Sequence, residues 1–243
     1  MSLDFLTPDA AAQRETRARS PMERRAVAAG ARLSPIEGWN VPNAYGEPIT
    51  ERERLTQTVG FADRCSLTKL ELQAEPETLA RIVAQAGGGV RLEPGMAARA
   101  QDAWWCPVTP ERLLVLGEPG ASEPLRAALT RAAQEAAGTV TLVDLTSGLA
   151  ALSLLGPGAR ELLARFCAID VRPKVTPVAG FRPGSVARTP GYLLVEAEDR
   201  LLVLVGWALG EYLWQVVADA AADLGGGPVG AEALAHHVEA ARA

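Results

Sequence analysis

The sequence predicts an α+β fold made of two tandem units, each an antiparallel sheet with helices on one side. The chain has 243 residues, of which 48% are hydrophobic and 22% charged, enough for one large or two modest packed domains. Segments with the two-residue periodicity of strands alternate with segments whose apolar residues recur at helical spacing. The order strand, helix, strand, strand, helix, strand fills the first half and recurs in the second, which favours two related units.

We expect the first unit to span residues 31–144, after a polar arm of residues 1–30, with packing of its N-terminal loop on the second unit as an alternative. Residues 34–48 predict an ordered loop, because prolines restrict φ and the aromatic side chains of the loop need a packing partner. The elements expected next are a helix at 50–59, a half-buried strand at 67–73, a helix at 77–85, strands at 103–108 and 112–116, a helix at 123–137 and a strand at 139–144. Asp144 should end the last strand and cap the turn after it.

The second unit should span residues 145–243. Its expected elements are a strand at 149–155, a helix at 159–166, a strand at 185–189, a strand pair at 192–196 and 201–205, and helices at 209–224 and 232–241. The loop that leads from the first of these helices to the strand at 185–189 is rich in proline.

Composition narrows the possible partners and compartment. A formal net charge of −5 provides no basic field to attract nucleic acid or an anionic membrane, and 5% aromatic residues argue against stacking of single strands. Three widely separated cysteines predict neither a disulfide framework nor a zinc site, so we expect no bound metal. No signal-like segment or apolar run approaching the ~20 residues of a membrane helix is evident, which predicts a cytoplasmic protein.

Arginine dominates the basic residues, since Lys69 and Lys174 are the only lysines among 24. This fits a genome-wide bias as well as a need for bidentate contacts. The arginine cluster from Arg14 to Arg32 indicates either a solvated helix or frayed terminus, or an arm that docks on a partner subunit. Trp104 and Trp105 are adjacent on an expected strand and must face opposite sides, so one of them needs cover that a partner chain could supply.

Common catalytic motifs are missing or incomplete. Gly156-Pro-Gly158 lacks both the GxGxxG pattern and the GK[ST] ending of phosphate-binding loops, and no GxSxG sequence occurs. His236 and His237, the only histidines, are adjacent near the end of the chain, which makes a Ser-His-Asp arrangement improbable. Glu198 and Asp199 form an acidic pair in an expected turn, where a solvated pair is the ordinary explanation.

Four segments together carry a family resemblance. They are residues 38–45 (GWNVPNAY), 59–69 (VGFADRCSLTK), 143–159 (VDLTSGLAALSLLGPGA) and 201–214 (LLVLVGWALGEYLW). In order and spacing they resemble the aminomethyltransferase superfamily, which includes the T-protein of the glycine cleavage system. Within it, the chain is most similar to the small γ subunit of heterotetrameric sarcosine oxidase.

The resemblance implies a folate-binding scaffold from which several ligands are missing. Family enzymes bind tetrahydrofolate between three domains, and the corresponding candidates here are Trp39, Tyr45, Asp102 and Glu198, with Asp102 also the weak catalytic candidate. The acidic pair of the family keeps at most one acid, Asp102. The family's arginine near the end falls at Leu234, and its C-terminal barrel domain has no counterpart in the sequence.

Three functions therefore remain open. The first is a non-catalytic, γ-like subunit of a heteromeric sarcosine or N-methyl amine oxidase or dehydrogenase, without its own active site. In such a complex, the resemblance implies that FAD, FMN and NAD reside on flavoprotein partner subunits. The second is a stand-alone tetrahydrofolate-dependent one-carbon enzyme that uses Asp102 and Glu198. The third is a stand-alone folate-binding module on the same scaffold.

Overall fold

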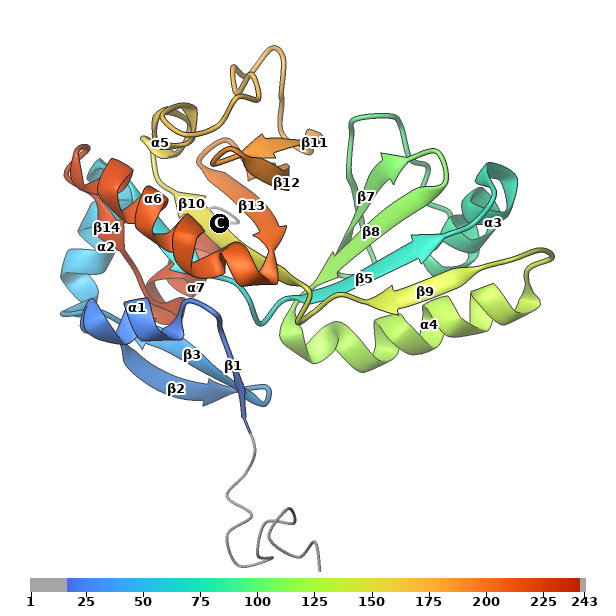
Figure 1. Cartoon of the computed structure of the whole chain (residues 1–243), viewed down its shortest axis with the longest axis horizontal. Helices are drawn as coiled ribbons and strands as arrows, with labels where there is room; N and C mark the ends of the chain where they lie inside the picture. The colour runs from blue at the N-terminus through green and yellow to red at the C-terminus, as the bar shows by residue number, and fades with distance from the viewer. Residues whose placement is uncertain (1–16, 241–243) are drawn as a thin grey trace, which may run out of the picture.

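The computed structural model describes residues 17–240 and places most strands in two large sheets (Figure 1). The six-stranded sheet has the order β11 (Phe181–Val186), β12 (Thr189–Ala197), β13 (Arg200–Gly206), β10 (Leu149–Leu155), β4 (Gly60–Asp63) and β14 (Gly227–Pro228). The five-stranded sheet has the order β6 (Ala98–Ala100), β7 (Ala103–Thr109), β8 (Arg112–Gly117), β5 (Thr68–Gln73) and β9 (Thr141–Asp144). A small third sheet joins β1 (Ala18–Arg19), β3 (Trp39–Ala44) and β2 (Arg32–Ile36).

Helices cover the outer faces of the two large sheets (Figure 1). On the five-stranded sheet these are α3 (Pro76–Ala86) and α4 (Ser122–Glu135), and on the six-stranded sheet they are α1 (Glu23–Ala28), α5 (Ala159–Ala164) and α6 (Gly210–Ala222). Two further helices, α2 (Pro48–Gln57) and α7 (Ala231–Ala240), pack beside β4 on the other face of the six-stranded sheet. Short 3₁₀ turns, η3 (Pro119–Ala121) and η4 (Trp207–Leu209), precede α4 and α6.

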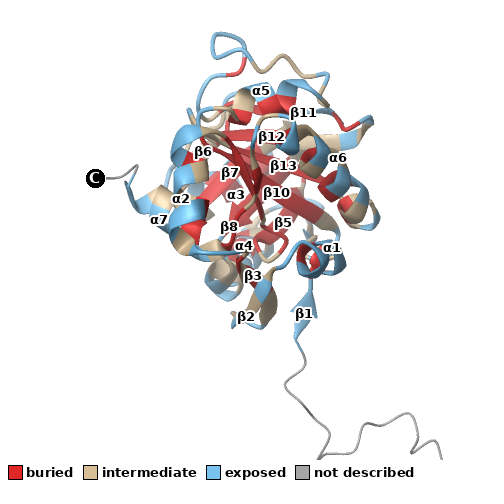
Figure 2. Cartoon of the chain, turned by 90° about the vertical axis from the view of Figure 1, so that its left-hand side faces the viewer, coloured by how far each residue is buried: buried red, intermediate tan, exposed pale blue. Residues whose placement is uncertain are grey.

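The inner faces of the two large sheets pack against each other. On β10, Leu152 and Leu154 face the helices, whereas Ala151 between them faces the other sheet, as the alternation of side chains along a strand requires. Trp104 and Leu116 of the five-stranded sheet share one apolar cluster with residues of β12 and β13. The result is four layers, helices, sheet, sheet and helices, with the buried residues concentrated in the sheets (Figure 2).

The α+β class predicted from the sequence is confirmed, and most expected elements occur within a few residues of their predicted bounds. Asp144 caps its turn as predicted, accepting a hydrogen bond of 2.8 Å from the backbone N–H of Thr146. Trp104 and Trp105 are both buried within this chain, Trp104 against the second sheet and Trp105 under the helices. No partner chain is needed to cover either ring.

Three sequence expectations were wrong in detail. The expected loop at 34–48 contains most of the hairpin of β2 and β3. The strand expected at 185–189 is β11, which begins earlier, at Phe181. Strand β5 was expected to be half-buried but is buried on both faces, because its polar side chains Lys69 and Glu71 lie inside the fold.

The described part of the N-terminal arm packs against the body of the protein. Met22 and Ala26 are fully buried beneath α1. Arg24 and Arg25 both contact the carboxylate of Glu211 on α6, at 2.6 and 2.9 Å. Arg14 lies outside the described residues, so the docking of the arm on a partner stays a prediction, as do the domain boundaries.

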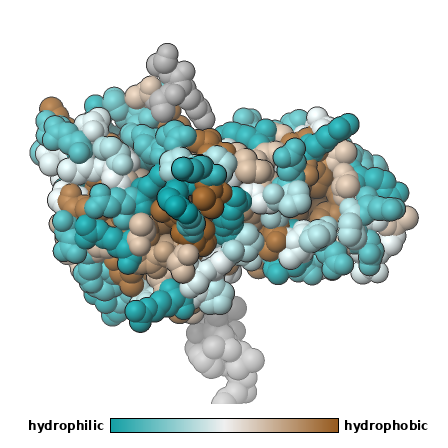
Figure 3. Space-filling view, turned by 90° about the horizontal axis from the view of Figure 1, so that it is seen from above, coloured by the Kyte–Doolittle hydropathy of each residue, from teal (hydrophilic) through white to brown (hydrophobic). Residues whose placement is uncertain are grey.

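No helix in residues 17–240 combines the length and the apolar character that crossing a membrane requires. Over the same residues, His, Cys, Asp and Glu side chains form no group of three that could hold a metal ion. On the face shown in Figure 3, hydrophobic residues are interspersed with hydrophilic ones.

Candidate functional site

Asp102 lies at the junction of the two large sheets, in the tight turn between β6 and β7. Gln101 and Asp102 both adopt left-handed backbone conformations, with φ of 51° and 55°. Such paired positive φ values match the twist of a two-residue hairpin. The turn directs Asp102 to a small cavity that we call the sheet junction, lined chiefly by Arg64, Arg99, Asp102, Trp104, Glu118 and Glu196.

Most charged groups of the sheet junction have a partner, although only Arg64 and Glu118 pair with each other. Arg64, whose side chain is 10% exposed, forms an ion pair of 2.9 Å with Glu118. The guanidinium of Arg99 lies 5.4 Å from the ring centroid of Trp104, within the range of a cation–π contact. Glu196 lies 3.2 Å from the guanidinium of Arg200. The buried indole N–H of Trp104 has no hydrogen-bond partner among the described residues.

The space inside the sheet junction is about 10 Å³. A single water molecule needs roughly 10–15 Å³ of such space, whereas drug-sized ligands occupy clefts of roughly 300–1,000 Å³. The junction therefore accommodates one water molecule at most, which the free indole N–H could bind. A pterin ring would require the side chains and the two sheets to move apart.

Glu198 lies away from the sheet junction, on the turn between β12 and β13. Its exposed carboxylate is 3.5 Å from Arg160, whose guanidinium also donates to the backbone carbonyls of Val171 and Thr176 at 2.6 and 3.0 Å. Glu198 thus belongs to the set of contacts that hold the loop after α5. The acids that line the sheet junction with Asp102 are Glu118 and Glu196, and Glu196 lies at a β-bulge that shifts the strand register after Val195.

Trp39 and Tyr45 lie on the helix-covered side of the six-stranded sheet. The Trp39 ring is 6.1 Å from that of Trp207, and the Tyr45 ring is 6.2 Å from that of Trp214. The Tyr45 hydroxyl is buried without a hydrogen-bond partner, and burial, with the nearby carboxylate of Asp63, raises its pKa. The structure therefore does not bring these two rings together with Asp102.

Lys69 is a buried residue whose role sequence reasoning missed. Its ammonium donates to the backbone carbonyls of Cys65, Leu67 and Thr146 at 2.8, 2.9 and 3.1 Å. Burial lowers the pKa of Lys69 to about 8, while the three carbonyls favour the charged form. These contacts hold the chain where it crosses from β4 into β5. The available signal was its rarity, since it is one of two lysines in an arginine-rich chain.

Glu51 is a second buried carboxylate that the sequence did not single out. Its Oε1 accepts hydrogen bonds from the backbone N–H groups of Tyr45 and Gly46 at 2.6 and 3.2 Å. Its Oε2 accepts one of 2.6 Å from the N–H of Gly230. A side chain at Gly230 would collide with the backbone of Asn43. Glu51 therefore fastens the start of α7 to the end of the β2–β3 hairpin.

The fold and the sheet junction define a class of α+β protein in which two packed sheets enclose a small polar space. The chain belongs to the family described as the GCVT N-terminal domain, whose sequence model matches residues 22–241. The match covers nearly all described residues, so the family assignment applies to both sheets.

Two solved structures share this fold. A chain of the heterotetrameric sarcosine oxidase of Corynebacterium sp. U-96, solved with pyrrole 2-carboxylate, has a TM-score of 0.66 and 21% identity over 85% of this chain and 96% of that one. The glycine cleavage aminomethyltransferase T of Bartonella henselae has a TM-score of 0.73 and 15% identity over 89% of this chain, which spans only 60% of that enzyme. No curated protein sequence matches at a significant level.

Proposed function

We propose that this chain is a non-catalytic, γ-like subunit of a heteromeric, flavin-dependent sarcosine or N-methyl amine oxidase or dehydrogenase. The observation that carries the proposal is the sheet junction, where about 10 Å³ of space remains and Arg64 is already paired with Glu118. In this proposal FAD, FMN and NAD reside on cytoplasmic flavoprotein partners. The chain stabilises the assembly next to a folate-binding subunit.

The chemistry of folate binding supports the absence of an active site here. A site for tetrahydrofolate needs a carboxylate for the pterin donors, a cation for the glutamate tail and walls that exclude water. At the sheet junction Arg64 is already paired with Glu118, and Arg99 lies over Trp104. Leu234, where the family resemblance places an arginine, is on the buried face of α7 in a cluster with Leu55 and carries no charge.

The structural comparisons support a subunit role because one solved structure with this fold is a chain of a heterotetrameric sarcosine oxidase. This chain spans 96% of its match in the heterotetrameric oxidase but 60% of the aminomethyltransferase.

The test is purification of the tagged chain from its native host. We expect it to bring flavin-bearing chains in fixed stoichiometry, with a flavin absorbance that bleaches when sarcosine or another N-methyl amine is added. A matched preparation with the tag on an unrelated protein controls for adventitious flavoproteins. A tagged chain that stays a monomer and carries no flavin chain would overturn the proposal.

A folate-binding module or one-carbon transferase is the second candidate, because Asp102 and Glu196 line one cavity. Its test is calorimetry of the purified full chain with tetrahydrofolate. Binding that falls more than tenfold in Asp102→Ala, but not in Glu198→Ala, would establish this alternative. Absence of heat at millimolar ligand would exclude it.

A further inference from the structure

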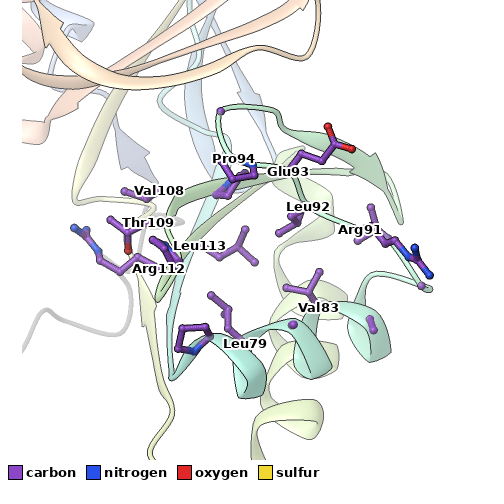
Figure 4. Close-up of a pocket in the computed structure, with 18 residues that line it drawn as sticks. Leu79, Val83, Arg91, Leu92, Glu93, Pro94, Val108, Thr109, Arg112 and Leu113 are labelled. Carbon is purple, nitrogen blue, oxygen red and sulfur yellow. The ribbon is translucent and has the colours of Figure 1, made fainter.

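A cleft of about 750 Å³ opens beside α3, on the face of the five-stranded sheet opposite to the sheet junction. We call it the α3 cleft. Its walls are α3, the loop of residues 89–95 and the end of the β7–β8 hairpin. Leu79, Val83, Leu92 and Leu113 line the same space from these three elements (Figure 4). Its volume lies within the roughly 300–1,000 Å³ of small-molecule sites.

The walls of the α3 cleft present mainly hydrocarbon, and the charged residues of the lining, Arg91, Glu93 and Arg112, lie at its edges. Leu92 points inward, whereas its neighbours Arg91 and Glu93 point away from the space (Figure 4). Arg112 contributes to one end of the lining but directs its guanidinium to Glu71, at 2.7 Å. The remaining lining residues are aliphatic residues, prolines, small residues and Thr109, and none of the described residues that line the cleft is aromatic.

The loop that forms one wall is held at both ends, so the space is built into the fold. At its start, the N–H of Gly89 donates to the carbonyl of Ala84 at 2.7 Å. At its end, the carbonyl of Gly95 accepts a hydrogen bond of 2.9 Å from the N–H of Phe181 in the other sheet. Arg182 also donates to the Gly95 carbonyl. Because these hydrogen bonds fix the loop at both ends, the wall does not need a ligand to take its position.

We propose that the α3 cleft binds the aliphatic chain of an uncharged, lipid-like molecule such as a fatty alcohol or ester. Preformed apolar walls favour a hydrocarbon, since each buried methylene gains free energy and little ordering of the protein is required. A carboxylate head group gains no net electrostatic attraction at the rim, because Arg91 and Glu93 carry opposite charges there. This ligand site is independent of the proposed subunit role.

The probe for this proposal is N-phenyl-1-naphthylamine, an uncharged dye whose fluorescence rises in apolar sites. We expect saturable binding to the purified full chain and at least tenfold weaker binding to Ala80→Phe, which places a ring in the cleft from an exposed position on α3. Ala127→Phe is the matched control, an exposed alanine on α4 outside the cleft, and should bind like wild type. Equal binding by both variants would overturn the proposal.

Competition identifies the class of ligand. Dodecan-1-ol should displace the dye at a concentration at least tenfold lower than dodecanoate. Displacement that favours dodecanoate would refute the uncharged class, and a lack of displacement by either compound would refute the site. If Ala80→Phe loses its native circular dichroism, Ala84→Leu serves as the blocking variant, since Ala84 lines the same wall from an exposed position.

Discussion

The sheet junction and the α3 cleft lie on opposite faces of the same strands, β7 and β8, and they are filled in opposite ways. The junction gathers arginines and acids around about 10 Å³, whereas the cleft leaves about 750 Å³ between aliphatic walls. Charged groups in this protein therefore mark places where parts of the fold are joined. The larger space lies where the lining is mainly leucine, valine, alanine and proline.

Removal of a buried charged group that joins two segments should lower the free energy of unfolding most. It tests whether charged groups in this protein hold parts of the fold together. Glu51→Ala leaves three backbone N–H groups without their acceptor, each worth about 1–3 kcal/mol when buried. We expect the free energy of unfolding in urea to fall by about 3 kcal/mol or more. Glu53→Ala, an exposed acid on the same helix, should change it by less than about 0.5 kcal/mol. Equal effects of the two variants would contradict a structural role for Glu51.

The buried ammonium of Lys69 should make stability depend on pH. Its folded pKa of about 8 lies below the unfolded value of 10.5, so between these values the unfolded state binds more protons and stability rises with pH. From pH 7.5 to 9.5 the free energy of unfolding of the wild type should rise by about 2 kcal/mol relative to Lys69→Met. The difference cancels the titration of Tyr45 and other groups present in both proteins. If the difference in unfolding free energy between the wild type and Lys69→Met does not change over this pH range, the carbonyls keep Lys69 charged.

Sequence patterns anticipated the fold better than the site. Periodicity located the long elements, because a strand such as β10 is almost wholly aliphatic and is followed by a Gly-Pro-Gly turn. Strand β4 was missed, since only four residues pair there and three of them, Gly60, Ala62 and Asp63, are not strand-forming. Resemblance pointed to Asp102, and the structure places it at the junction. The position of Glu196 at the junction was not predicted, because a register shift within β12 cannot be read from composition.

The walls of the α3 cleft should tolerate truncation better than the closed core does. Leu92→Ala removes a partly exposed side chain that faces open space, and we expect a loss of about 1 kcal/mol or less. Leu72→Ala, the same change at a fully buried position of the same sheet, should cost about 2–5 kcal/mol. Thermal unfolding of the two variants measures the contrast. Similar losses would indicate that the cleft is closed by packing in solution.

Substitution of Asp102 should have the smallest effect on the free energy of unfolding. The sign of that effect distinguishes a residue that only forms the turn from one that binds a ligand. With φ of 55°, Asp102 occupies a backbone conformation that glycine adopts without strain. We expect Asp102→Gly to leave the unfolding free energy unchanged or to raise it by up to about 1 kcal/mol, because relief of strain outweighs the greater entropy of the unfolded chain. Asp102→Ala keeps a Cβ in the same conformation and should be no more stable than wild type. If instead both variants abolish flavin-complex formation or folate binding, the carboxylate itself is required and the junction is a functional site.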